Sequence, residues 1–203
     1  MPALYATLAT SVIAALAAFA AIFLWRDNRQ LRSALDTQRT RDLLTGIYNR
    51  PYFMELAERE INRAQRTGRH VAVLIVDIDG CKKLNEEYGH HGGDMALTTL
   101  AEQAQGAIRD YDLLGRFSGE EVAIVLPDTN ETGALIVAER LREKLAAHPV
   151  MLRSGECFTV SVSIGMAITG SEMDTLDDAL LAADAALHAA KKNGPGHTQS
   201  HCG

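Results

Sequence analysis

The sequence predicts a mixed α/β (α+β) domain, with one central mixed sheet flanked by helices, preceded by a single transmembrane helix. Three observations support this. An uncharged run of 23 residues extends from Ala3 to Trp25. After it, segments of helical periodicity alternate with short runs rich in Val and Ile. Two of these runs flank a Ser-Gly corner, which indicates a hairpin and hence antiparallel pairing in the sheet.

Residues 1–25 are predicted to form the membrane helix. At about 1.5 Å per residue, the uncharged run is long enough to span a hydrocarbon layer of about 30 Å. It lacks the basic start of a signal peptide and is longer than a typical signal core. Arg26 and two more arginines follow, while only two residues precede the run. The positive-inside rule then places the residues after the helix in the cytoplasm, at the inner membrane. Because only two residues precede the helix, we expect no sensor domain on the far side of the membrane.

Residues 26–41 are predicted to be a helical linker, because they are polar and contain neither Gly nor Pro. Leu24, Leu31 and Leu35 have the spacing of a short parallel coiled coil. A single solvated helix fits equally well, since two heptads are too few to separate the two.

The remaining residues, 42–203, are predicted to form the soluble domain. The periodicity indicates helices at 50–68, 93–108, 131–148 and 175–194, and strands at 70–79, 112–117, 121–127 and 157–168. The polar segment 80–94 is expected to be irregular. The tail after about residue 195 is expected to be disordered.

The composition limits the classes of function. With 26 acidic and 20 basic residues, the chain has a net charge of -6. This balance does not favour nucleic-acid binding, although a nucleotide could bind through a metal ion. The three cysteines are an odd number without metal-type spacing, which fits a reducing compartment.

Four acids stand where strands end or turn. Asp77 and Asp79 end the most apolar strand, and Glu120 and Glu121 follow the Ser-Gly corner. If the hairpin lies beside that strand, the carboxylates converge and suit Mg²⁺ held jointly with phosphate oxygens. If it does not, the two pairs are merely solvated. The sequence leaves both possibilities open.

The segment 80–94 offers candidate nucleotide contacts. Lys82 and Lys83 could reach phosphates as flexible charges. Asn85 and Asp94 could read the edge of a base, since an amide and a carboxylate supply matching acceptors and donors. Alternatively, Asn85 makes a turn and Asp94 caps the following helix.

These motifs, in this order, resemble the GGDEF-domain diguanylate cyclases. "DLLTGIYNRPYF" is similar to the opening motif of that family, and "DIDGCKKLNEEYGHHGGD" to its nucleotide-binding segment. "SGEEV" stands where GG(D/E)EF belongs, and "VSIGMA" and "ADAALHAAKKNG" are similar to the closing strand and helix. The resemblance covers residues 42–194 and implies a nucleotidyl-cyclase-like palm fold.

The resemblance implies that a homodimer condenses two GTP into cyclic di-GMP and two pyrophosphates. Metal ions, Mg²⁺ or Mn²⁺, would be bound by Asp77, Glu120, Glu121 and the Ile78 carbonyl. Glu121 would alternatively assist loss of the 3′-hydroxyl proton. The guanine would be read by Asn85 and Asp94. The phosphates and their surroundings would be contacted by Lys82, Lys191, Gly80, Cys81 and Gly119.

The segment "RDYD" is similar to the R-x-x-D product-inhibition site of the family. Arg109 and Asp112 would bind cyclic di-GMP, with Arg140 on the next helix as a secondary contact. A salt bridge at a helix end is the ordinary alternative.

Five positions depart from the pattern of the family: Ser118, Val122, Cys81, His188 and Pro195. We expect Ser118 to resist positive φ and to narrow the approach to a ligand, while Gly119 still permits a type II-like corner. Pro195 removes an arginine contact to phosphate.

Two hypotheses follow: an active, membrane-anchored cyclase under product inhibition, or a degenerate domain that binds GTP or cyclic di-GMP as a receptor.

Overall fold

The computed structural model describes residues 39–169 and 175–201. The predicted membrane helix at residues 1–25 and nearly all of the predicted linker at 26–41 lie outside these ranges. Within the described ranges, no helix is both long enough and apolar enough to cross a bilayer.

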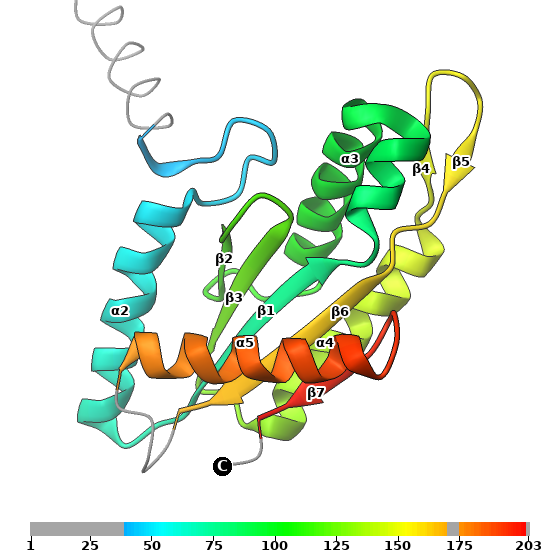
Figure 1. Cartoon of the computed structure of the whole chain (residues 1–203). Helices are drawn as coiled ribbons and strands as arrows, with labels where there is room; N and C mark the ends of the chain where they lie inside the picture. Colours follow the sequence, from blue (N-terminus) through cyan, green and yellow to red (C-terminus); the bar gives the residue numbers. More distant parts are fainter. Residues whose placement is uncertain (1–38, 170–174, 202–203) are drawn as a thin grey trace, which may run out of the picture. The chain divides into compact units, whose positions relative to one another are not determined.

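A five-stranded mixed sheet forms the centre of the domain (Figure 1). Its order is β2 (Leu113–Arg116), β3 (Glu121–Pro127), β1 (Val71–Ile78), β6 (Val162–Ile168) and β7 (Thr198–Ser200). Neighbouring strands are antiparallel except β6 and β7, which are parallel. The predicted mixed sheet is therefore confirmed, and β1 occupies its middle position.

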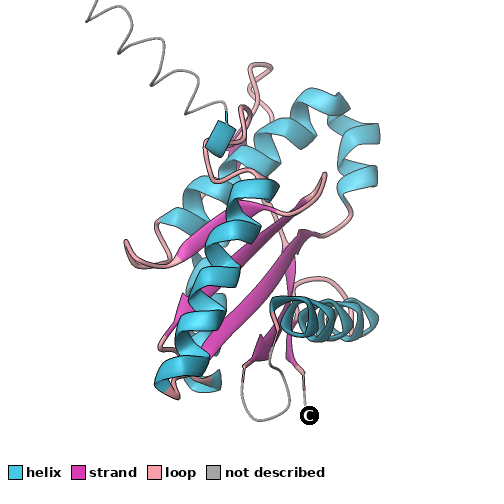
Figure 2. Cartoon of the chain, turned by 90° about the vertical axis from the view of Figure 1, so that its left-hand side faces the viewer, coloured by secondary structure: helices cyan, strands magenta, loops and turns pink. Residues whose placement is uncertain are grey.

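Two pairs of helices cover the two faces of the sheet (Figures 1 and 2). Helices α3 (Cys81–Gln105) and α4 (Glu131–Ala147) pack on one face, and α2 (Arg50–Thr67) and α5 (Leu176–Lys192) on the other. β1 is buried along its whole length. Its alternate residues divide between the layers, since Leu74 and Val76 join the α3/α4 core and Val73 and Ile75 the α2/α5 core.

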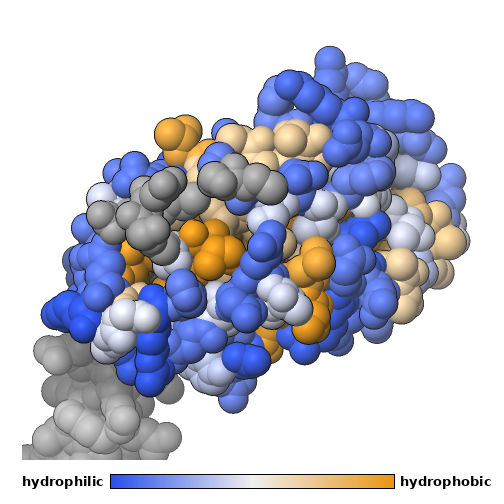
Figure 3. Space-filling model, turned by 90° about the horizontal axis from the view of Figure 1, so that it is seen from below, coloured by the Kyte–Doolittle hydropathy of each residue, from blue (hydrophilic) through white to orange (hydrophobic). Residues whose placement is uncertain are grey.

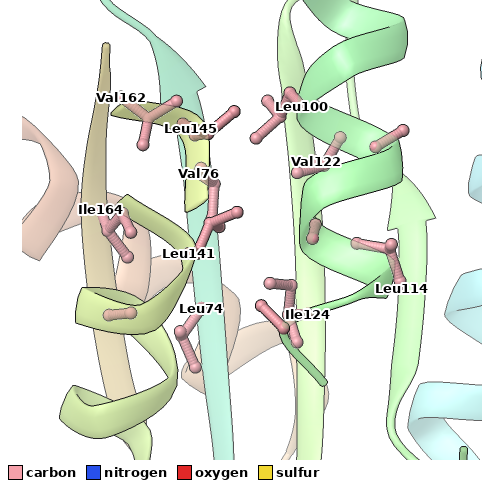
Figure 4. Packing of buried hydrophobic residues seen from close by; sticks show 14 of the residues in the cluster. Leu74, Val76, Leu100, Leu114, Val122, Ile124, Leu141, Leu145, Val162 and Ile164 are labelled. Carbon is pink, nitrogen blue, oxygen red and sulfur yellow. The ribbon is translucent and has the colours of Figure 1, made fainter. Parts of the chain in front are cut away.

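The α3/α4 core is shown in Figure 4. Leu141 and Leu145 of α4 and Leu100 of α3 cover branched side chains of the central strands. Val122 lies fully buried in this core. The surface seen from below the view of Figure 1 is mostly hydrophilic, with apolar side chains in separate patches (Figure 3).

Local signals explain where the predicted helix 50–68 begins and ends. The side chain of Asn49 accepts a hydrogen bond from the Tyr52 backbone, and Pro51 occupies the first turn of α2. Gly68 ends the helix in the left-handed conformation with φ 64°. Helices α4 and α5 likewise match their predicted segments.

Three predicted segments are wrong. Residues 81–94 are helical rather than irregular, and α3 bends at Gly89, whose φ is 70°. The predicted strand 157–168 is divided into β5 (Cys157–Phe158), which pairs with β4 (Val150–Met151), and β6. The tail is ordered as far as Ser200, because β7 pairs with β6 and the His201 N–H donates to the Met166 carbonyl.

Candidate active site

Three adjacent strands place Glu121, Asp77 and Ser163 in one row across the sheet. Asp77 of β1 is paired with Glu121 of β3 on one side and with Ser163 of β6 on the other. Directly paired residues of antiparallel strands point to the same face, which here is the face that α5 covers. The predicted convergence of the hairpin acids on β1 is thus confirmed for Asp77 and Glu121.

The carboxylate of Asp77 is nearly buried and is paired with a lysine of α5. Lys191 Nζ lies 2.8 Å from Asp77 Oδ1. Burial raises the pKa of Asp77, and the Lys191 hydrogen bond and charge act in the opposite direction. The charges of Glu121 and Glu120 add to the rise, and the pKa stays above its ordinary value. The Lys191 contact therefore does not fully offset the burial of the Asp77 carboxylate and the charges of the two glutamates.

A hard divalent cation would balance this charge. The carboxylates of Asp77, Glu120 and Glu121, with the Ile78 carbonyl, are the oxygen donors that Mg²⁺ prefers. Within residues 39–169 and 175–201, however, no three His, Cys, Asp or Glu side chains stand close enough together to enclose an ion. The donor set therefore fits Mg²⁺ when water or substrate oxygens complete the coordination, as is usual for this ion.

The Ser118–Gly119 corner differs from the predicted turn. A type II turn needs positive φ at its second central residue, and neither Ser118 nor Gly119 is among the described residues with positive φ. Instead, the N–H groups of Phe117 and Ser118 both donate to the Glu121 carbonyl, at 2.9 and 3.2 Å. The predicted type II-like corner is wrong, and Ser118 is accommodated without left-handed strain.

Arg116 holds this corner in place, a role that the sequence analysis missed. Its guanidinium donates to the carbonyls of Ser118 (3.3 Å) and Gly119 (3.0 Å), and to Asp42 Oδ2 (3.0 Å). Burial alone would raise the pKa of Asp42, but hydrogen bonds from Thr45 and the contact with Arg116 outweigh it and lower the pKa. The signal was present in the opening D-x-L-T-G motif, which contains both Asp42 and Thr45.

The first turn of α3 lies directly after β1. Gly80 precedes it in the left-handed conformation and provides no side-chain cap, so first-turn N–H groups are left for another acceptor such as phosphate. Lys82 is exposed on this turn. Cys81 is buried; its burial, together with a hydrogen bond to Glu120 and the charges of Glu120 and Asp77, raises the pKa of its thiol to about 11. The thiol is therefore neutral near pH 7.

α3, which bends at Gly89, packs the side chain of Asn85, one of the two predicted guanine readers, against Gly93. A Cβ added at Gly93 would lie 2.1 Å from the side-chain oxygen of Asn85, so only glycine permits this approach. Asp94 is the next residue and is exposed. The Asn85 amide also donates to the Cys81 sulfur at 3.7 Å. Asn85 and Asp94 lie within α3, so neither makes the turn or the helix cap considered as alternatives.

Asp79 does not join the other acids. Its Oδ1 accepts from Ser163 Oγ (2.6 Å), and its Oδ2 accepts from Ser161 Oγ (2.6 Å) and the Gly196 N–H (2.7 Å). These three donors tie the end of β1 to the segment after α5, which contains Pro195. Asp79, one of the four acids considered for a cation site, thus has its carboxylate oxygens occupied by hydrogen bonds within the fold.

Arg109, Asp112 and Arg140 lie near one another. The Arg109 N–H donates to Asp112 Oδ2 at 2.8 Å, and its guanidinium donates to the Tyr111 hydroxyl at 2.9 Å. Burial raises the pKa of Asp112, and the charges of Arg109 and Arg140 act in the opposite direction. Asp112 Oδ1 is buried without a hydrogen-bond partner, the only such side-chain atom in the described part of the chain.

The comparisons with known proteins agree with this geometry. Residues 39–197 match the family model described as "Diguanylate cyclase, GGDEF domain". The response regulator PleD of Caulobacter vibrioides is 37% identical over 154 residues, which are 75% of this chain and 34% of PleD. The probable diguanylate cyclase DgcC of Escherichia coli is 34% identical over 165 residues, 81% of this chain and 44% of DgcC. The chain thus spans less than half the length of these relatives.

Solved structures share the fold. The GGDEF domain of DgcB from Caulobacter crescentus, in complex with c-di-GMP, has a TM-score of 0.77 at 26% identity and covers 81% of this chain and 94% of its own. The active GGEEF domain of a diguanylate cyclase from Vibrio cholerae has a TM-score of 0.71 at 30% identity. The match covers 76% of this chain and 97% of the Vibrio cholerae chain. With the matching family model extending over most of its length, this chain belongs to the GGDEF-domain diguanylate cyclase family.

Proposed function

We propose that this chain is an active diguanylate cyclase that condenses two GTP into cyclic di-GMP and two pyrophosphates. The observation that carries the proposal is the row of Glu121 and Asp77 beside Lys191 and the uncapped first turn of α3. Acids for a metal ion are thereby assembled with a lysine and free N–H groups for phosphate, where the central strand β1 ends. The membership in the family supports the same reaction class.

Each condensation forms one bond and breaks one. The 3′-hydroxyl oxygen of one GTP bonds to the α-phosphorus of the other, and the bond from that phosphorus to pyrophosphate breaks. Glu121 lies at the open corner, where it takes the hydroxyl proton and is also available as a ligand to a second metal ion. Lys191 and the N–H groups of Cys81 and Lys82 offset charge on the phosphates. Asp77, Glu120 and the Ile78 carbonyl would hold Mg²⁺, which when bound would supply further neutralisation of the phosphate charge.

Guanine selection is assigned to Asn85 and Asp94. The amide and the carboxylate together present the donor and acceptors that match one edge of guanine. Because each domain has one such reader, two domains must face each other to present two nucleotides. An inner-membrane anchor at residues 1–25, as the sequence predicts, would raise the effective concentration of such pairs.

A turnover assay with the full chain, GTP and Mg²⁺ tests the cyclase proposal. We expect cyclic di-GMP and pyrophosphate in a 1:2 ratio, and no product after chelation of the metal. If a verified dimer makes no cyclic di-GMP yet still binds it, the chain is a receptor and the cyclase proposal fails.

Product inhibition through Arg109, Asp112 and Arg140 is the second part of the proposal. A hollow of about 500 Å³ lies beside Arg109 and is lined also by Arg69, and guanidinium groups of this kind suit a phosphate or the edge of guanine. The Arg109→Ala variant should keep its initial rate and lose inhibition by added cyclic di-GMP. Inhibition that persists unchanged in this variant would place the inhibitory site elsewhere.

A further inference from the structure

The serine that replaces the first glycine of the signature makes a short contact with one of the site acids. Ser118 Oγ donates to Glu121 Oε2 at 2.6 Å. A glycine at this position has no side chain and cannot make this bond. The substitution therefore adds an interaction to the corner, rather than only narrowing it.

The support behind this hydroxyl is itself fixed. Arg116 donates to the Ser118 and Gly119 carbonyls and is anchored on Asp42, so the corner backbone is held on both of its peptide groups. The side chains of Arg116 and Asp42 are only 27% and 18% exposed, which limits competition from water. In contrast, Glu121 is half-exposed, and its long side chain would otherwise sample several rotamers.

We propose that Ser118 is a positioning residue that orients the Glu121 carboxylate for metal binding and proton transfer. Its hydroxyl occupies one lone pair of Oε2, which leaves Oε1 for the metal ion or for the 3′-hydroxyl proton. The ordering of Glu121 is thereby completed before the nucleotide arrives, as preorganised sites require. This inference rests on the proposed function of Glu121.

Binding of Mn²⁺ together with a non-cyclising GTP analogue tests the proposal without turnover. The full chain is titrated and free Mn²⁺ is followed by electron paramagnetic resonance. We expect Ser118→Ala to weaken Mn²⁺ binding about fivefold, as loss of a partly exposed bond to a charged group suggests. Ser118→Thr keeps the hydroxyl and should stay within about twofold of the original protein.

A double-mutant cycle separates positioning from a general effect on the corner. In a Glu121→Gln background, Ser118→Ala should change Mn²⁺ binding by less than about twofold. Ser154→Ala is the matched control, because Ser154 also donates to a nearby exposed glutamate, Glu156, at 2.9 Å in the turn between β4 and β5. That variant should bind Mn²⁺ like the original protein.

Steady-state kinetics give a second readout. Ser118→Ala should lower kcat by about the same factor as it weakens Mn²⁺ binding, about fivefold, with the KM for GTP nearly unchanged. An equal effect of Ser118→Ala in both backgrounds, or none on Mn²⁺ binding, overturns the proposal. If no variant makes cyclic di-GMP, the cyclase proposal fails, while the Mn²⁺ titrations still decide the role of Ser118.

Discussion

Asp77 and Asp79 lie two residues apart at the end of β1, yet their environments are opposite. Asp77 faces one lysine and two further acids, and its pKa is raised. Asp79 accepts three hydrogen bonds from two serine hydroxyls and a backbone N–H. Burial disfavours the charged form of the first carboxylate, whereas the fold supplies the second with three hydrogen-bond donors.

This difference separates binding from stability. A carboxylate whose hydrogen bonds are satisfied within the fold, such as that of the partly buried Asp79, holds elements together, because breaking its bonds leaves the donors unpaired. A carboxylate whose pKa is raised costs stability in its charged form, and a cation recovers that cost only when it binds. Asp77 is therefore expected to matter for activity and Asp79 for folding, and four variants test this division.

Asp77→Asn should produce the largest effect. We expect cyclic di-GMP formation to fall more than about 100-fold, since Asp77 is one of the proposed metal ligands. The free energy of unfolding should stay the same or increase, because the neutral amide removes a charge that burial disfavours. Turnover and urea unfolding are measured on the same sample, and a large loss of stability would break the comparison.

Asp79→Asn should have the reverse profile. An amide cannot accept all three hydrogen bonds, so the free energy of unfolding should fall by about 2 kcal/mol. Activity should fall less than about tenfold, because Asp79 affects the site only indirectly, through Ser163 beside Asp77 and the segment around Gly196. The urea midpoint measures the first effect. Unchanged stability would show that the three donors contribute little.

Lys191→Met sharpens the role of charge at Asp77. Lys191 opposes the rise in the pKa of Asp77, so its removal raises that pKa further. The carboxylate then protonates at a higher pH as the solution is acidified, and the acid limb of the kcat/KM profile should shift upward. At neutral pH the KM for GTP should rise about tenfold from the lost phosphate contact. Lys192→Met, on the exposed neighbour, is the control and should show no shift in the acid limb.

Asp42→Asn should give the smallest effect. Hydrogen bonds from Thr45 and the contact with Arg116 outweigh burial and lower the pKa of Asp42. This contribution is therefore present above the ordinary pKa of about 3.8 and is lost as the pH falls through the lowered value. We expect a loss of about 1 kcal/mol at neutral pH. Thermal unfolding is measured from pH 7 to pH 3. The melting temperatures of the original protein and of Asp42→Asn should approach each other as the pH falls.

Most elements were predictable because their apolar residues are periodic. The Val-rich run of β1 and the pattern of α2 indicate their structures directly. The first half of α3 was missed, since its Lys, Glu and His residues have no apolar period and its glycines suggested a loop. Gly89 instead allows a bend, and Gly93 allows the approach of Asn85.

The order in the tail could not be predicted from local sequence. β7 has no apolar run, and its side chains are only half-buried. It is held by parallel pairing with β6 and by a contact from Thr198 to Glu139 of α4. Partners so distant in the chain leave no periodic signal.

By itself, the sequence determined which acids, amides and lysines the site could use, because motif order and spacing identify residue types. Only the tertiary structure decided their partners. Lys191 reaches Asp77 from another helix, and Asp79 binds Ser163 and Gly196, which lie 84 and 117 residues further along. Two aspartates that are equivalent in the sequence acquire different roles because charge compensation depends on distances in space, which strand pairing and helix packing set.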